Sequence, residues 1–238
     1  MDDHRQPGVA GGQFGPDVYS TWRASSLGEI VEVLEHRLLL RLAGDLRDRA
    51  VLDVGCGDGT LTLALARAGA ASVIGCDIDP RMISHAVARG ARQQDAVHYT
   101  VADAARLPFA DRSFELVTVV TVLAFIPDAE GAVREMARVL KPGGSLIVGE
   151  LGKWSLWAAL RWMRGWLGAK TWRAATFRTA RQLHELAQAA GLGVEHVSGA
   201  IFFPPWLPFA RMVAPCDAAL GEQTTLGAAF VAVRSRKA

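Results

Sequence analysis

The 238-residue chain is poor in cysteine and has no long apolar run. Both features limit the classes of protein to which it can belong. Its three cysteines are an odd set without a C-x-x-C pair, which indicates a reducing cytoplasm. Half of the residues are hydrophobic, yet no uninterrupted apolar stretch reaches the roughly 18 residues that a membrane span needs. The first residues contain no apolar core, so no secretory signal is expected and the chain is predicted to be cytoplasmic.

The six histidines lack the spacing of metal ligands. His36, His85 and His184 fall inside expected helices, where solvent exposure or packing explains them. No metal site is therefore expected.

Strand and helix patterns alternate strictly between residues 50 and 150. Strands are expected near 50–54, 72–77, 97–101, 114–120 and 145–150, with helices from Thr60, Pro80 and Asp128. Two more strands, near 193–203 and 227–233, bring the expected total to seven. The pattern predicts an α/β fold: a doubly wound, Rossmann-like, mainly parallel sheet with a helical cap and with ligands at the carboxyl ends of its strands.

The most informative segment is Ala50–Gly59, where an apolar strand leads into glycines spaced G-x-G-x-G and then into a helix. Such a loop lets the backbone approach a ligand, and the helix presents N–H groups and a positive dipole end to an anion. The dinucleotide fingerprint G-x-G-x-x-G would need a glycine at position 60, where the chain has Thr60. The spacing therefore argues against a dinucleotide.

An acid follows the next expected strand at the distance typical of a ribose ligand. Asp77 lies 18 residues after Gly59, and an acid near this position hydrogen-bonds ribose hydroxyls in doubly wound folds. Asp79, directly before Pro80, is expected to cap the next helix. That leaves Asp77 available for a ligand.

Ordered segments of the chain resemble the motifs of class I S-adenosylmethionine-dependent methyltransferases. Residues 51–61 resemble motif I, 73–83 the motif that follows, 102–117 the later nucleoside-binding segments, and 139–148 the turn and fifth strand. The resemblance runs from about Tyr19 to Gly149. It is strongest toward the small-molecule group that includes the ubiquinone and menaquinone C-methyltransferases.

The resemblance implies S-adenosylmethionine as cofactor, with its carboxylate at the glycine loop and its ammonium near the loop backbone or Asp53. Asp77 would bind the ribose, Ile78 and Met82 would pack on adenine, and Asp103 with the Ala104 backbone would bind the adenine edge. Tyr19 resembles an aromatic lid, and the segment from Val119 to Pro127 would line the donor methyl group. The expected cofactor-binding residues are Tyr19, Asp53, Gly55, Cys56, Gly57, Gly59, Asp77, Ile78, Met82, Asp103, Ala104 and Val119.

Two of these acids have a structural alternative. Asp53 could accept the loop's own N–H groups, and we expect it to serve both roles. Asp103 could simply be a solvated turn residue.

Composition and the resemblance together suggest the organisation of the chain. Residues 1–18 are rich in glycine and proline and are expected to be a flexible segment. Residues 19–238 would form the methyltransferase domain. Its cofactor-binding core would span 45–150, and its cap and substrate region would be 19–44 and 151–215.

No catalytic residue can be named from the sequence. Methyl transfer needs a general base only when the acceptor carries a proton that must leave. Many relatives carry a polar residue or histidine near Ala124, where this chain has alanine. Glu150, at the end of the fifth strand, could face the substrate or equally cap Lys153 or the next helix.

The segment 151–173 holds five basic residues, no acid and five of the seven tryptophans. A helix near 154–168 places Leu156, Leu160, Met163 and Leu167 on one stripe, with Arg161 and Arg164 opposite. We favour a cap that turns this stripe toward the active site and leaves the arginines in water. The alternative is a peripheral membrane contact through 153–173.

Residues 202–209 are too rich in proline for a helix and are expected to form an apolar loop. With the cap, they favour a hydrophobic acceptor.

The chain is thus predicted to methylate a small, hydrophobic molecule and to produce S-adenosylhomocysteine, without a nucleic-acid partner. The alternatives are a methyltransferase for nucleic acid or protein, a nicotinamide-dependent oxidoreductase, and a cofactor-binding protein without catalysis. The sequence does not indicate the acceptor atom or the oligomeric state.

Overall fold

The computed structural model describes residues 21–91 and 97–238, so the segment 1–18 and Tyr19 lie outside the described residues. The strands are β1 (Ala50–Val54), β2 (Ser72–Asp77), β3 (Val97–Val101), β4 (Phe114–Val120), β5 (Leu140–Leu151), β6 (Leu192–Ala200) and β7 (Phe230–Lys237). The α-helices are α2 (Ser26–Ala43), α3 (Thr60–Arg67), α4 (Pro80–Gly90), α5 (Ala129–Val139), α6 (Leu156–Trp166), α7 (Lys170–Ala174), α8 (Ala180–Ala189), α9 (Leu207–Val213) and α10 (Asp217–Gln223). The 3-10 turns are η1 (Leu123–Phe125) and η2 (Ala214–Cys216).

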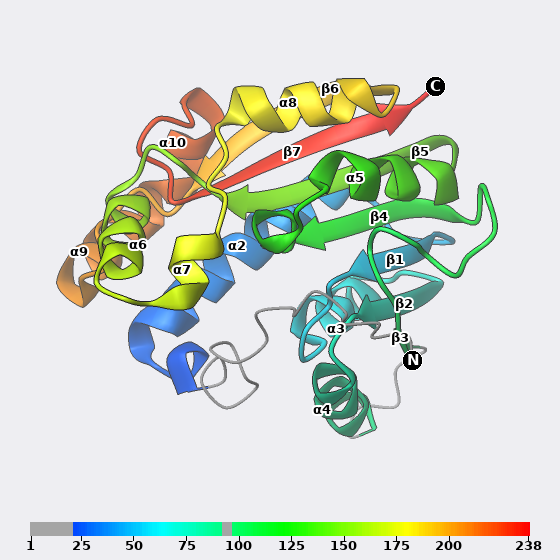
Figure 1. Cartoon of the computed structure of the whole chain (residues 1–238), viewed down its shortest axis with the longest axis horizontal. Helices are drawn as coiled ribbons and strands as arrows, with labels where there is room; N and C mark the ends of the chain where they lie inside the picture. The colour runs from blue at the N-terminus through cyan, green and yellow to red at the C-terminus, as the bar shows by residue number, and fades with distance from the viewer. Residues whose placement is uncertain (1–20, 92–96) are drawn as a thin grey trace, which may run out of the picture.

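The strands form one seven-stranded sheet in the order β3-β2-β1-β4-β5-β7-β6 (Figure 1). Strands β1 to β5 pair in parallel, and β7 runs antiparallel between β5 and β6. The prediction of a doubly wound, mainly parallel α/β sheet is confirmed.

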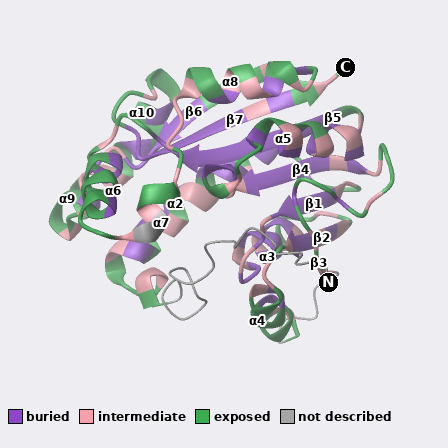
Figure 2. Ribbon diagram, viewed as in Figure 1, coloured by how far each residue is buried: buried purple, intermediate pink, exposed green. Residues whose placement is uncertain are grey.

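Helices cover both faces of the sheet, and the strands between them are largely buried (Figure 2). Alternate strand residues enter two apolar clusters, as the two-residue period of a strand requires. One cluster joins the sheet to α5 and α8, and the other joins it to α2, α3, α6 and α9. Among the described helices, none is long and apolar enough to cross a membrane.

Side-chain caps begin several helices where the sequence places them. Ser25 caps α2, Asp79 caps α4 and Asp128 caps α5, each by accepting a backbone N–H bond. Thr179 caps α8 in a reciprocal pair with Gln182. Because a cap satisfies N–H groups that the helix leaves unpaired, these residues fix the starts of the helices.

Two predictions for the C-terminal half are wrong. The segment 202–209 is not a loop throughout, since α9 begins at Leu207 with Pro208 in its first turn, where proline is tolerated. Strand β5 begins at Leu140 rather than near 145, with a register irregularity between Phe114 and Leu116 of its partner β4.

The expected orientation of α6 is also wrong. The stripe of Leu156, Leu160, Met163 and Leu167 is exposed, and the helix buries Trp157, Ala158 and Gly165 instead. The Trp157 indole N–H donates to the Phe203 carbonyl at 2.8 Å. A Cβ at Gly165 would lie 3.0 Å from the backbone of α7, so the glycine allows close packing there. Burying the large Trp157 indole with a hydrogen-bond partner stabilises this orientation of α6 more than burying the narrower leucine stripe would.

Candidate functional site

The loop between β1 and α3 contains glycines with positive φ angles of 68° (Gly55), 55° (Gly57) and 79° (Gly59). A Cβ at Gly55 would lie 2.1 Å from a Val122 methyl carbon, and one at Gly59 would lie 2.5 Å from the Tyr99 hydroxyl. Around Gly57 nothing lies within 4 Å of the same position. The loop is thus packed against protein at two glycines and open at the third, which is the cradle a bound ligand needs.

Asp77 closes the loop from the end of β2. Its Oδ2 accepts the Gly57 N–H and its Oδ1 accepts the Asp79 N–H, both at 2.9 Å. Asp79 caps α4 as expected, while Asp77 has two backbone partners that the sequence did not indicate. Each oxygen keeps a second lone pair for a ligand hydroxyl, and burial raises the pKa of this carboxyl.

Asp53 lies beneath the loop and is fully buried. Its oxygens accept the hydroxyls of Thr62 at 2.6 Å and Thr118 at 2.8 Å. The structural partners are thus threonines of α3 and β4, not the loop N–H groups that the sequence suggested. Burial, against these hydrogen bonds, raises the pKa of Asp53 to about 6.

Asp58 was not singled out from the sequence, although it is the most heavily paired acid of the loop. Arg23 donates to it at 2.7 Å and Arg89 at 2.6 Å. Arg23 also pairs with Glu32 of α2. These contacts join the start of α2 and the end of α4 to the glycine loop. Their partners are 31 to 35 residues apart in sequence, so no local pattern indicates them.

The residues expected around adenine lie at the ends of β2 and β3. Ile78 follows Asp77 and is 48% exposed, an apolar surface beside the loop. Met82 is partly buried on α4, and Ala104 is buried. Asp103 is exposed, and its Oδ1 accepts the Ala105 N–H at 2.9 Å, which is the turn that the alternative predicted.

Two expected residues are in the core. The Cys56 N–H donates to the Cys76 carbonyl at 2.9 Å, and burial raises the pKa of its thiol. Val119 lies within β4 and is fully buried. Any open segment after β4 therefore begins at Thr121, whose φ of +54° is uncommon for a non-glycine residue.

The turn η1 is held from both sides next to the glycine loop. The Leu123 N–H donates to Glu150 Oε1 at 2.7 Å, and its carbonyl accepts Arg178 Nη1 at 2.8 Å. The Thr176 N–H donates to the Ala124 carbonyl at 2.8 Å. Since Val122 also packs at Gly55, this turn connects the loop with the segment between α7 and α8.

Glu150 is the buried carboxyl of this clamp and caps neither Lys153 nor α6. Burial raises its pKa from 4.5 to about 7, against the attraction of Arg178. Its second oxygen is buried without a hydrogen-bond partner among the described residues. The Lys153 N–H donates to the Arg178 carbonyl instead, and Ser155 caps α6.

A second set of charged side chains lies between α2 and the helices α6 and α7. The Arg161 guanidinium lies 5.3 Å from the Trp157 ring centre and 5.0 Å from that of Trp172. Glu35 attracts it from α2, and burial raises the pKa of Glu35 to about 7. Within the described residues, neither charge has a hydrogen bond or an ion pair. Aromatic faces and polar groups without partners thus occur together here.

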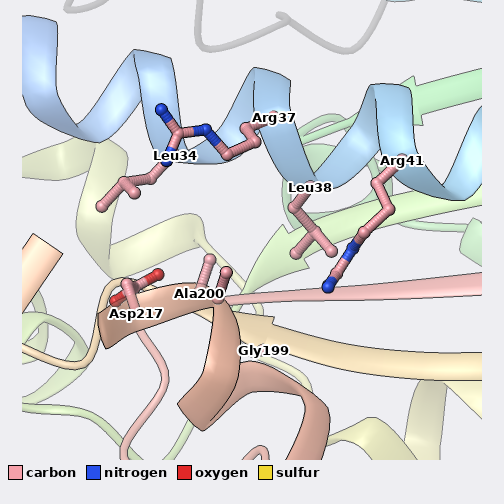
Figure 3. A pocket seen from close by; sticks show the side chains of 8 residues that line it. Leu34, Arg37, Leu38, Arg41, Gly199, Ala200 and Asp217 are labelled. Carbon is pink, nitrogen blue, oxygen red and sulfur yellow. The ribbon is translucent and has the colours of Figure 1, made fainter. Parts of the chain in front are cut away.

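The small cavity of Figure 3 lies elsewhere, between α2 and the end of β6. Leu34, Leu38, Ala200 and Asp217 are among its lining residues, and its volume is about 60 Å³. Both Asp217 oxygens accept backbone N–H bonds, from Ile201 and Phe202. A cavity of this size is far below that of a ligand pocket.

Comparison with known proteins identifies the family. The sequence profile of a methyltransferase domain matches residues 52–148. A ubiquinone biosynthesis O-methyltransferase of Xanthomonas oryzae is 33% identical over 174 residues, which cover 71% of this chain and 72% of that protein. The chain belongs to the class I S-adenosylmethionine-dependent methyltransferases.

Other relatives of this methyltransferase are similar over shorter stretches. The 27-O-demethylrifamycin SV methyltransferase of Amycolatopsis mediterranei is 40% identical over 119 residues, 48% of this chain and 44% of that protein. The chain spans about half, or less, of the length of several curated relatives that it matches. The crystal structure of a methyltransferase from Thermotoga maritima superposes with a TM-score of 0.72 at 24% identity, covering 93% and 96% of the two chains. That likeness shows the fold.

Proposed function

We propose that this methyltransferase transfers the methyl group of S-adenosylmethionine to a small hydrophobic molecule, leaving S-adenosylhomocysteine. The observation that carries the proposal is the open cradle at Gly57 beside Asp77. S-adenosylmethionine supplies a methyl group on a positively charged sulfur, which leaves as a neutral thioether.

The residues of the loop fit this cofactor chemically. Helix α3 begins at Thr60, and its N-cap residue Gly59 provides no side-chain cap, so the first N–H groups of the helix suit the carboxylate of the amino-acid part. Asp53 would attract the ammonium group from beneath the loop, and Asp77 would offer two carboxylate oxygens to the ribose diol. Ile78 and Met82 would pack on adenine, with Asp103 and Ala104 at its edge.

We further propose that the methyl acceptor binds between α2 and the helices α6 and α7. The Trp157 and Trp172 rings and Phe125, the exposed residue of η1, would supply apolar contacts there. Arg161 and Glu35, which lack hydrogen-bond partners among the described residues, would orient the polar head of such a molecule. Methyl transfer depends mainly on proximity and orientation, and the clamp of Glu150 and Arg178 on Leu123 holds this wall in place.

A hydrophobic acceptor would dissolve in membranes. We therefore also propose a peripheral membrane contact through 153–173.

Two measurements test the function. Calorimetry should give saturable binding of S-adenosylhomocysteine and none of NADH. Incubation with a cell extract and methyl-labelled cofactor should place the label in an organic-solvent extract. Label recovered in the nucleic acid or protein fraction would contradict a small hydrophobic acceptor, and binding without any transfer would leave a cofactor-binding protein.

A further inference from the structure

The outer side of α6 is apolar and unusually exposed. Trp162 is 59% exposed, Trp166 79%, and Leu167, which follows the helix, 80%. Isolated exposed apolar residues are common, but a helix that exposes tryptophans and its leucine stripe together is not. The side of α6 that packs against the protein carries Trp157, Ala158 and Gly165.

Helix α9 continues this surface. Trp206, Phe209 and Met212 are exposed, while Ala210 is buried. Ala210 and Trp157 belong to the same apolar cluster, so α6 and α9 pack their inner sides on a common base. Both helices lie at one end of the molecule and show exposed outer sides (Figures 1 and 2). We call this surface the α6–α9 face.

Basic side chains are exposed on α6 and α9, just before α6, and on the neighbouring helix α7. Lys153, Arg164, Arg173 and Arg211 are exposed, and none forms an ion pair within the described part of the chain. The sequence has no acid between Gly152 and His184, nor between Val197 and Cys216. Some exposed arginines elsewhere are paired, as Arg134 is with Glu130 and Arg181 with Glu185, whereas Arg67 on α3 has no ion pair among the described residues. The face therefore combines apolar side chains with basic residues that form no ion pair among the described residues, and Glu29 of α2 is an acid that lines the same pocket as Arg211.

These features distinguish between occupants. A second copy of the same face would bring like charges together, which disfavours association. An anionic bilayer surface attracts basic side chains and accepts tryptophan rings at the level of its headgroups. We propose that the α6–α9 face docks on the surface of an anionic membrane, with the tryptophans inserted and the basic residues on lipid phosphates. The inference deepens the proposed contact through 153–173 by adding α9 and by specifying the lipid charge.

Vesicle binding tests the proposal. The full chain should sediment with phosphatidylcholine vesicles that contain phosphatidylglycerol, less with pure phosphatidylcholine, and less again at high salt. The double variant W162A/W166A should bind on the order of tenfold more weakly. Arg164→Gln and Arg173→Gln should each weaken binding about fivefold.

Matched controls lie away from the face. Val87 on α4 is 50% exposed, as is Met163 on α6, so Val87→Ala should leave vesicle binding unchanged while Met163→Ala lowers it. Arg67→Gln on α3 is the matched charge control. All variants should bind S-adenosylhomocysteine like the wild type, since none lies at the glycine loop.

Three results would overturn the docking proposal: no vesicle binding, binding equal on neutral and anionic vesicles, or a dimer that W162A/W166A dissociates. Failure of the enzymatic proposal is distinguishable, because it would appear as a lack of S-adenosylhomocysteine binding or of methyl transfer in a chain that still binds vesicles.

Discussion

The glycine-loop edge of the sheet and the α6–α9 face use their side chains in opposite ways. At the loop edge, charged groups are buried and held, as Asp53 is by two threonines and Asp58 by two arginines. On the α6–α9 face, apolar rings are exposed and arginines lack ion pairs within the described residues. Charged groups that are fixed by hydrogen bonds at the loop edge suit the binding of a small ligand. Exposed aromatic rings beside arginines without ion pairs suit contact with a large partner.

Within one turn, helix α6 carries one arginine that is enclosed by protein and one that is exposed. Arg161 lies between two indole rings, and Arg164 is exposed three residues later. A sequence count of basic residues treats them alike, yet only the second is available to an external surface.

The largest expected effect on stability comes from comparing substitutions on the buried and exposed sides of α6. Trp157→Ala should cost about 3–5 kcal/mol of unfolding free energy, because it empties a buried site and leaves the Phe203 carbonyl without its donor. Trp166→Ala should change stability by less than about 0.5 kcal/mol. Urea denaturation measures both, and equal effects would contradict the orientation of α6.

Glu150 should make the loop edge sensitive to pH. Its pKa in the folded state is raised from 4.5 to about 7, so its contribution to stability is fully present below 4.5 and is lost as the pH rises through 7. In Glu150→Gln, up to about 3 kcal/mol of this decline should disappear. Denaturation at several pH values tests it. Glu185→Gln, at an exposed ion pair of α8, should leave the decline in place.

Asp77→Ala should weaken S-adenosylhomocysteine binding about ten- to a hundredfold, because a charge-assisted hydrogen bond contributes roughly 1.5–3 kcal/mol. The control Asp79→Ala removes the cap of α4 and should cost about 1 kcal/mol of stability at unchanged affinity. Calorimetry that finds the same affinity for Asp77→Ala and the wild type would remove Asp77 from the ribose site.

Gly57→Ala tests the open cradle at equal backbone strain. Gly57 and Gly191 both have positive φ with nothing within 4 Å of an added Cβ, so alanine at either should cost roughly 1–2 kcal/mol of stability. Only Gly57→Ala should also weaken S-adenosylhomocysteine binding, about tenfold or more, because its methyl group would occupy ligand space. Equal affinities in the two variants would place the ligand elsewhere.

Local chemistry made much of the fold predictable. Strand positions followed from apolar runs, and Asp79 and Asp128 indicated helix starts because each cap acts on an N–H group two or three residues away. The glycine loop followed from its spacing, since the turn needs positive φ at Gly55, Gly57 and Gly59. The roles of the expected cofactor residues remain predictions.

The rest depended on contacts between distant residues. The pairing of Asp58 with Arg23 and Arg89, and of Glu150 with Leu123, joins separate elements and leaves no local pattern. The orientation of α6 was missed because the helix carries apolar residues nearly all around. Periodicity alone could not distinguish the leucine stripe from the side that bears Trp157 and Gly165.

The position of β7 affects how the chain is made. Strand β6 hydrogen-bonds to β7 and not to β5, so during synthesis it leaves the ribosome before its partner. Strands β2 to β5 can each join the sheet as they emerge, because each has one neighbouring strand that is already made. Strand β6 must wait for residues 230–237, because β7 is the strand with which it pairs. Because α6 precedes β6 and β7 in the chain, its tryptophans leave the ribosome before the sheet is complete.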